Sequence, residues 1–264
     1  MDRYENFPSR YVLPRHVDVW LPPGYETAPD RRYPVLYMHD GQNCFDPAES
    51  SFGKAWEVQT ALERLIAKGQ AEPAIIVGIW NVAMRRYLEY RPARPFLHLL
   101  PAARAVVTAG LGGWPHSDAY LAFLVNELKP HIDAQYRTQP ASAHTAIMGS
   151  SMGGLISLYA ICEYPEIFGA AGCLSTHWPA VEGVIEPYLR DCLPDPATHR
   201  IYFDFGTQTL DALYRPTQQL VDTLMIEGGY ESGVNWITRE YPGDGHFETY
   251  WANRVHEPIK FMLS

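Results

Sequence analysis

The sequence lacks several features that would assign it to special classes of protein. No uninterrupted apolar run reaches the ~18 residues that a membrane-spanning helix requires, so we expect no membrane partner. The N-terminal residues, MDRYENFPSRYVLP, contain no basic stretch followed by an apolar one, which is the mark of a secretion signal. We therefore expect a cytoplasmic protein, or a secreted one if a signal peptide has been removed.

Cysteine and positive charge are also scarce. The four cysteines are widely spaced and form no CxxC pair, which argues against a zinc knuckle or a redox dithiol. Two of them, Cys162 and Cys173, lie in apolar stretches and are expected to be buried free thiols. The formal net charge of −9 disfavours nucleic acid as a partner, because its phosphates would be repelled.

The sequence does contain a regular alternation of short apolar runs and amphipathic segments. The predicted strands are residues 16–21, 34–40, 74–80, 144–149, 169–175, 200–206 and 235–241. Several are continuously apolar, as in strands covered by helices on both faces, whereas the first one alternates and predicts an edge or antiparallel strand. Apolar residues recur at helical spacing between the strands. The sequence therefore predicts an α/β fold in which a mostly parallel sheet has helices on both faces and binds ligands at the carboxyl ends of its strands.

One domain is predicted over residues 1–264, because no repeat, low-complexity tract or linker divides the chain. Residues 91–118 interrupt the alternation with several prolines and glycines. This segment is interpreted as a lid or pocket wall, or alternatively as an ordinary surface excursion.

The segment GSSMG, residues 149–153, matches the G-x-S-x-G motif with Ser151 at its centre. A predicted strand precedes it and the helical segment GLISLYAICEY follows it, which is the strand–turn–helix context that the motif requires. The small neighbours permit a sharp turn, and the helix N-terminus supplies N–H groups for a developing oxyanion. Ser151 is therefore the predicted nucleophile, with a plain tight turn as the alternative.

A serine nucleophile needs a base and an orienting acid, which follow it in the chain as acid and then histidine in this type of fold. His246 is the predicted base, because it lies in the glycine-rich loop YPGDGHFETYW just after the last predicted strand. The acid should follow the preceding strand, so Asp211 in the next loop is favoured over Asp204 within the strand itself.

The oxyanion hole requires two N–H donors. The backbone N–H of Met152, the residue after the nucleophile, is one of them. Gln42, with Gly41 as the alternative, is the second predicted donor, in the loop HDGQNCFDP after the strand at 34–40. A plain turn is the other interpretation of that loop. No metal-ligand spacing accompanies His39 and Asp40 in it, so no catalytic metal is expected.

Six segments in a fixed order extend from about Tyr33 to about Trp251: YPVLYMHDGQNCFD, VGIWN, FLVNELKPHIDAQYRT, GSSMGGLISLYA, GTQTLDALYRP and PGDGHFETYW. Together they resemble the "putative esterase" family, which includes esterase D, enterochelin esterases, feruloyl esterases and mycolyltransferases. The resemblance implies an α/β-hydrolase fold and a Ser–Asp–His mechanism without a cofactor, carried here by Ser151, Asp211 and His246.

The resemblance also implies residues of the substrate pocket. The family often has Asn, Arg and Glu-Tyr after its fourth strand, and IWNVAMRRYLEYRP supplies Asn81 and either Arg85 or Arg86, with spacing one residue longer. Our hypothesis is that one of these arginines, assigned to Arg86, binds a polar or acidic part of the substrate. Aromatic side chains that could form the pocket wall, or equally pack in the core, are Trp56, Trp80, His177, Trp178 and Trp251.

These residues together predict a serine carboxylic-ester hydrolase that acts through an acyl-enzyme on a small-molecule or carbohydrate-linked ester. An acyltransferase with the same triad is one alternative. A non-catalytic binding module with this fold is the other, although all three triad members are present. The sequence predicts neither the ester nor the oligomeric state.

Overall fold

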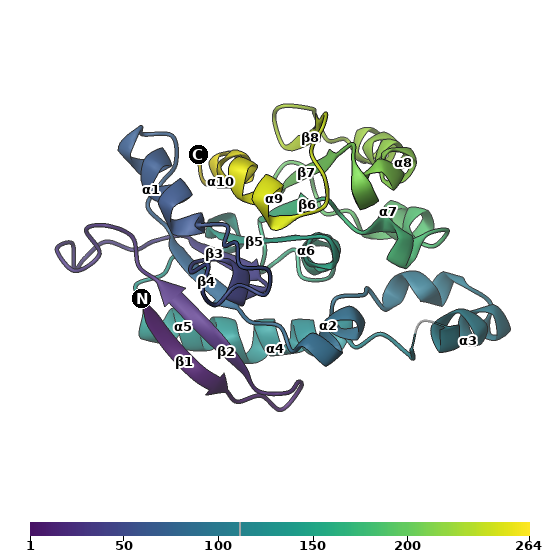
Figure 1. The fold of residues 1–264 in the computed structure, drawn as a ribbon, viewed down its shortest axis with the longest axis horizontal. Coiled ribbons are helices and arrows are strands. Elements are labelled where there is room, and N and C mark those ends of the chain that lie inside the picture. The colour runs from purple at the N-terminus through teal and green to yellow at the C-terminus, as the bar shows by residue number, and fades with distance from the viewer. Residues whose placement is uncertain (111) are drawn as a thin grey trace.

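A computed structural model describes residues 1–110 and 112–264, and an eight-stranded sheet forms its centre (Figure 1). The strand order is β1-β2-β4-β3-β5-β6-β7-β8. The pairs β1·β2 and β2·β4 are antiparallel, and every other pair is parallel. The strands are β1 (Asp2–Phe7), β2 (Arg15–Trp20), β3 (Val35–His39), β4 (Ile75–Ile79), β5 (Thr145–Ser150), β6 (Ala170–Leu174), β7 (Arg200–Gly206) and β8 (Trp236–Tyr241).

Helices cover both faces of this sheet. Alternate side chains of β3 face the two helical layers. Leu36 and Met38 belong to the same core cluster as α1, α9 and α10, whereas Val35 and Tyr37 belong to the cluster that contains α4 to α8. The α-helices are α1 (Val58–Ala67), α2 (Ala83–Glu89), α3 (Pro101–Gly110), α4 (Ser117–Phe123), α5 (Lys129–Gln135), α6 (Met152–Glu163), α7 (Ile185–Cys192), α8 (Arg215–Glu227), α9 (Glu248–Arg254) and α10 (His256–Leu263). The mostly parallel sheet with helices on both faces confirms the predicted α/β-hydrolase fold. Burial on both faces also explains why the strands are continuously apolar.

The edge of the sheet next to β2 differs from the prediction. The strand β2 is antiparallel, as its alternating pattern suggested, but it lies inside the sheet because β1 pairs with its outer side. The segment DRYENF has no pattern typical of a strand, since only Phe7 in it is buried. This edge strand is therefore held by its pairing with β2 rather than by apolar side chains.

Residues 91–118 form a short 3-10 helix (Arg94–His98), then α3, and then the start of α4, apart from residue 111, which lies outside the described residues. Figure 1 shows α3 at the periphery of the molecule, away from the sheet. A lid or pocket wall in this segment stays a prediction.

The cysteines lie as the sequence predicted. In the part of the chain that the structure describes, all four are free thiols, and Cys162 and Cys173 are buried. Over the same residues, no helix combines the length and the apolar character that crossing a bilayer demands.

The chain order places a crevice between β3 and β5. From β3 the chain passes to β4 on one side and later to β5 on the other, so the loops after β3 and β5 diverge at this point. Ligands of open α/β sheets bind at such switch points, beyond the carboxyl ends of the strands. The predicted nucleophile and oxyanion donors lie in these two loops.

Candidate active site

The turn between β5 and α6 places Ser151 at its apex. Its backbone has φ +58° and ψ −120°, a conformation that strains any residue other than glycine. Its N–H donates to the carbonyl of Leu174 at 2.8 Å, and its own carbonyl accepts from the N–H of His177 at 3.1 Å. A glycine is required at position 149, because a Cβ there would lie 2.9 Å from the backbone of Gly153. The surrounding packing therefore holds the serine in the strained turn.

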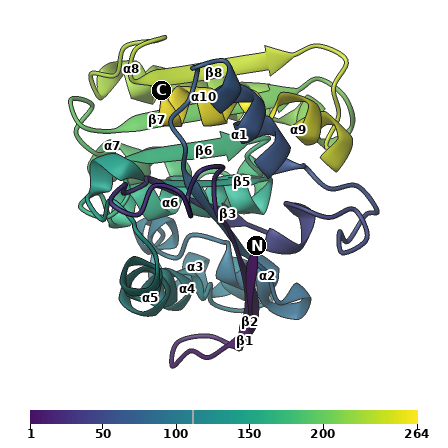
Figure 2. The ribbon, with the colours of Figure 1, turned by 90° about the vertical axis from the view of Figure 1, so that its left-hand side faces the viewer.

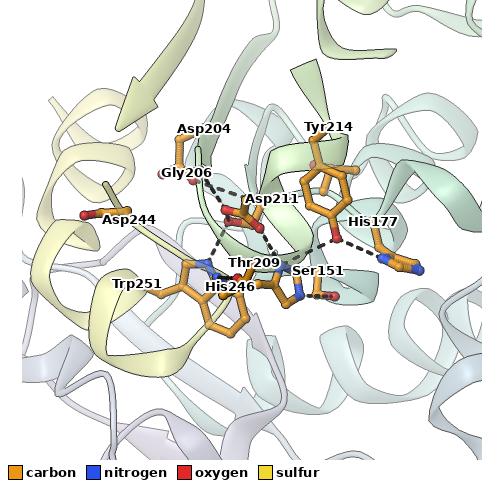
Figure 3. Close-up of polar contacts among 12 residues, drawn as sticks. Ser151, His177, Asp204, Gly206, Thr209, Asp211, Tyr214, Asp244, His246 and Trp251 are labelled. Carbon is orange, nitrogen blue, oxygen red and sulfur yellow. Dashed lines mark hydrogen bonds and ion pairs between the residues drawn. The ribbon is translucent and has the colours of Figure 1, made fainter. Parts of the chain in front are cut away.

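His246 links Ser151 to Asp211 through two hydrogen bonds (Figure 3). Its Nε2 lies 2.8 Å from Ser151 Oγ, and its Nδ1 lies 2.6 Å from Asp211 Oδ1. Asp211 comes from a 3-10 turn after β7 (Thr209–Leu213), and His246 comes from the loop after β8. The backbone N–H of His246 donates to Thr209 Oγ1 at 2.8 Å, which fixes that loop beside the turn. The structure thus brings together the three residues predicted as nucleophile, acid and base.

The second carboxylate oxygen of Asp211 also has well-placed donors. Ser175 Oγ and the backbone N–H of Gly206 each lie 2.7 Å from Asp211 Oδ2. Burial alone would raise the pKa of Asp211, but the hydrogen bonds from His246, Ser175 and Gly206 outweigh it and hold the pKa below its ordinary value. The carboxylate therefore stays ionised and can orient the imidazole and stabilise an imidazolium.

Ser175, which the sequence analysis did not select, has its hydroxyl direction fixed by its neighbours. Its Oγ accepts hydrogen bonds from Trp251 Nε1 and Arg254 Nη2, each at 2.9 Å. Indole and guanidinium groups can only donate, so the single hydroxyl proton of Ser175 must point to Asp211. The only sequence signal was that Ser175 ends a predicted strand at the carboxyl edge of the sheet.

Asp204, the alternative candidate for the acid, has other partners. It is fully buried, and its carboxylate binds Arg254 through contacts of 3.0 and 3.2 Å. Arg254 also binds Asp244 at 2.8 Å, so it ties the loop that carries His246 to the end of β7. Burial raises the pKa of Asp204, and the charge of Arg254 opposes that effect. Asp204 is placed to hold the site together, whereas Asp211 is the carboxylate that contacts the histidine.

The two predicted oxyanion donors lie at the ends of neighbouring strands. Met152 is the first residue of α6, so its N–H has no acceptor within the helix. Gln42 lies in a 3-10 turn (Gly41–Asn43) directly after β3, and its side-chain Oε1 accepts from the backbone N–H of Asn81 at 3.2 Å. Their role as donors stays a prediction.

The turn that carries Gln42 crosses β4 at very close range. A Cβ on Gly41 would lie 2.4 Å from the carbonyl carbon of Gly78 and 2.6 Å from the backbone nitrogen of Ile79. We expect Gly41→Ala to displace the turn and the N–H of Gln42, and to lower kcat for a p-nitrophenyl ester by about 10²-fold or more. Gly110→Ala is the matched control, because a Cβ there meets nothing within 4 Å in the part of the chain that the structure describes. An unchanged kcat in Gly41→Ala would contradict this role for the turn.

A cavity of about 430 Å³ opens beside the triad. Ser151 and His246 line it, and so do the predicted pocket residues Asn81, Arg86 and Trp56, together with Gln42. A larger cavity, about 710 Å³, lies at the opposite, amino ends of β5, β6 and β7, and no triad residue lines it. Of these two cavities, the smaller one is therefore the one that the predicted nucleophile and base line.

Arg86 reaches this cavity but is already paired. Its Nε and Nη2 donate to the two carboxylate oxygens of Asp40 at 2.8 and 2.7 Å, and Asn81 Nδ2 donates to the same carboxylate at 2.7 Å. Burial would raise the pKa of Asp40, but Arg86 and Asn81 outweigh it and lower the pKa. The charge that was expected to meet an acidic substrate is thus compensated within the protein.

Three of the predicted pocket residues, Trp80 among them, do not line this cavity. Trp178 is 1% exposed, donates to Gln218 at 3.2 Å and packs against Phe203, so its side chain belongs to the core rather than to the cavity wall. This corrects the expectation for Trp178, because this residue begins a 3-10 turn (Trp178–Val181) whose side chains are mostly buried. His177 does not line the cavity either, and its Nδ1 lies 2.8 Å from the hydroxyl of Tyr214 (Figure 3).

Comparisons with known proteins identify a family for this chain. A family model named Esterase, described as "Putative esterase", matches residues 12–254. The uncharacterized protein YbbA of Bacillus subtilis is 27% identical over 196 residues, which cover 74% of this chain and 68% of YbbA. A siderophore triacetylfusarinine C esterase of Aspergillus fumigatus is 32% identical over 135 residues, which cover 51% of this chain and 41% of that protein. The structure of a ferulic acid esterase superposes with a TM-score of 0.72 at 21% identity and covers 99% of this chain and 97% of its own.

Proposed function

Because the chain belongs to the esterase family that matches residues 12–254, we propose that it is a serine carboxylic-ester hydrolase that works through an acyl-enzyme on Ser151. Membership of the family supports ester hydrolysis. The observation that carries the finer proposal is the chain of hydrogen bonds from Ser151 through His246 to Asp211, with 2.8 and 2.6 Å between the paired atoms.

The proposed reaction begins when Ser151 Oγ attacks the ester carbonyl carbon while His246 Nε2 takes the hydroxyl proton. The N–H groups of Met152 and Gln42 hold the oxyanion of the tetrahedral intermediate. His246 then gives its proton to the alcohol oxygen as the carbon–oxygen bond of the ester breaks. Water, activated by the same histidine, attacks the acyl-enzyme and releases the acid.

The substrate class is proposed more broadly. One sequence relative is named for a siderophore ester, and the similar solved structure is named for ferulic acid. We propose a small-molecule or carbohydrate-linked ester, since a cavity of about 430 Å³ falls within the size range of small-ligand sites. An alcohol in place of water would make the same residues an acyltransferase.

The acyl-enzyme can be tested directly. Mixing the protein with p-nitrophenyl acetate should release a burst of p-nitrophenol equal to the enzyme concentration, if deacylation is slower than acylation. Mass spectrometry of the acid-quenched protein should find one acetyl group on the peptide that contains Ser151. An acetyl group on another residue, with none on Ser151, would contradict the proposal.

A further inference from the structure

Glu248 is a carboxylate in the substrate cavity that the proposed reaction does not use. It is the first residue of α9, lines the cavity beside Ser151, and is 8% exposed. Figure 2 shows α9 and α2 at the same end of the sheet, toward which the arrows of β6 and β8 point. Residues from α9 and α2 thus meet above the carboxyl ends of the strands.

No side chain of the described residues forms a hydrogen bond or an ion pair with Glu248. Apart from its own backbone N–H, its carboxylate has neither a hydrogen-bond donor nor an ion-pair partner among residues 1–110 and 112–264. Asp40 in the same cavity shows the contrast, because Arg86 and Asn81 supply it with three donors. A buried carboxylate without a cationic partner is costly, so Glu248 is ready to pair with a bound cation.

The other ionisable groups that line the cavity leave no net charge to balance Glu248. Arg86 and Asp40 cancel each other as an ion pair. Burial lowers the pKa of His39 to about 3, so this histidine is neutral. His246 must be neutral to accept the proton of Ser151. The charge that remains is that of Glu248.

We propose that Glu248 selects substrates by charge, so that the cavity prefers esters bearing an ammonium group over neutral ones and rejects carboxylated esters. An ammonium group gains a partner in the carboxylate, a neutral group gains none, and a carboxylate is repelled. This inference rests on the proposed function, and it replaces the expectation that Arg86 favours acidic substrates.

Burial also raises the pKa of Glu248, and the charge of Asp40 adds to this effect, whereas its own N–H, His246 and Arg86 oppose it. A carboxyl group that gains a cationic partner is held in its ionised form. A bound ammonium group would therefore stabilise the charge that burial disfavours.

The test compares p-nitrophenyl esters that differ only at the end of the acyl chain. One ends in a trimethylammonium group, one in the isosteric tert-butyl group, and one in a carboxylate. A second series places the charge on the alcohol, with a choline ester against its dimethylbutyl isostere. The wild type should show a kcat/KM about tenfold higher for the cationic than for the neutral member of at least one series, and about tenfold lower for the carboxylated ester.

In Glu248→Gln these ratios should fall to near one. Glu248→Asp keeps the charge and should keep the sign of the preference, which provides a second variant if the first does not fold. Glu63→Gln removes an exposed charge from α1 and should leave all the ratios unchanged.

Two results would overturn the inference while the proposed function stands. One is a wild type that hydrolyses the neutral ester through Ser151 without preference by charge, and the other is a folded Glu248→Gln that keeps the wild-type ratios. Failure of the proposed function looks different: the wild type would hydrolyse none of the esters, or Ser151→Ala would hydrolyse them equally well. That result would overturn both.

Discussion

Replacing Ser151 with alanine is expected to lower kcat for a p-nitrophenyl ester by about 10⁶-fold, as when the nucleophile of a complete triad is lost. The variant keeps the predicted oxyanion donors and the cavity, so a residual rate above that of uncatalysed hydrolysis should remain. The measurement is steady-state hydrolysis by a preparation whose wild-type contamination has been limited by titration of the active site.

The adjacent serine of the same motif is the control. Ser150 is the last residue of β5, is 5% exposed, and has no contact with His246 among the hydrogen bonds of the described chain. Ser150→Ala should stay within about tenfold of the wild type, because it removes no reacting atom. Loss of activity in Ser150→Ala together with retention in Ser151→Ala would show that the other serine is the nucleophile.

Exchanging Asp211 for asparagine should lower kcat by about 10⁴-fold, because it should move the proton of the neutral His246 imidazole from Nδ1 to Nε2. The backbone N–H of Gly206 always donates, so the amide oxygen of the substituted side chain would have to take the place of Oδ2. The amide NH₂ group would then face His246 Nδ1, and the histidine would carry its proton on Nε2. In that tautomer it cannot accept the proton of Ser151.

The matched variant Asp204→Asn should have a different effect. It leaves the buried guanidinium of Arg254 with Asp244 as its remaining carboxylate, so we expect the free energy of unfolding to fall by about 3 kcal/mol. The loss in kcat should be far smaller than in Asp211→Asn. Urea denaturation and kinetics on the same two preparations would separate the roles, and a greater loss of kcat in Asp204→Asn would show that Asp204 is the acid of the triad.

The central strands were predictable from the sequence because both faces of the sheet are buried. Residues 75–79 and 145–150, for example, are buried throughout, so their apolar character marks them as strands without any three-dimensional information. β1 was not predictable, since its polar side chains are exposed and only its pairing with β2 makes it a strand. The strand β1 forms only because it pairs with β2, and the sequence of residues 2–7 alone carries no information on that pairing.

Some residues of the candidate site could likewise be predicted from the sequence, and others could not. Ser151 lies in a local motif, and the order of strands along the chain narrowed the choice of acid and base, so these three residues could be predicted to meet. Ser175 and Glu248 were not selected, because the role of Ser175 comes from its contacts with α9 and that of Glu248 from a cavity that it shares with α2, and in both cases the other helix is distant in the sequence. Trp178 was assigned to the pocket wall although its aromatic character suits the core equally well, and the structure shows that it is buried in the core.

The strained backbone of Ser151 lowers the conformational stability of the protein at the residue that we propose as the nucleophile. A non-glycine residue at φ +58° costs of the order of 1–3 kcal/mol, which is a sizeable part of the 5–15 kcal/mol by which folded domains are usually stable. The protein can therefore tolerate a smaller loss in its free energy of unfolding from substitutions elsewhere than the size of its core suggests. Mutational drift toward greater stability would favour glycine at this position, so only selection for the chemistry keeps a serine there.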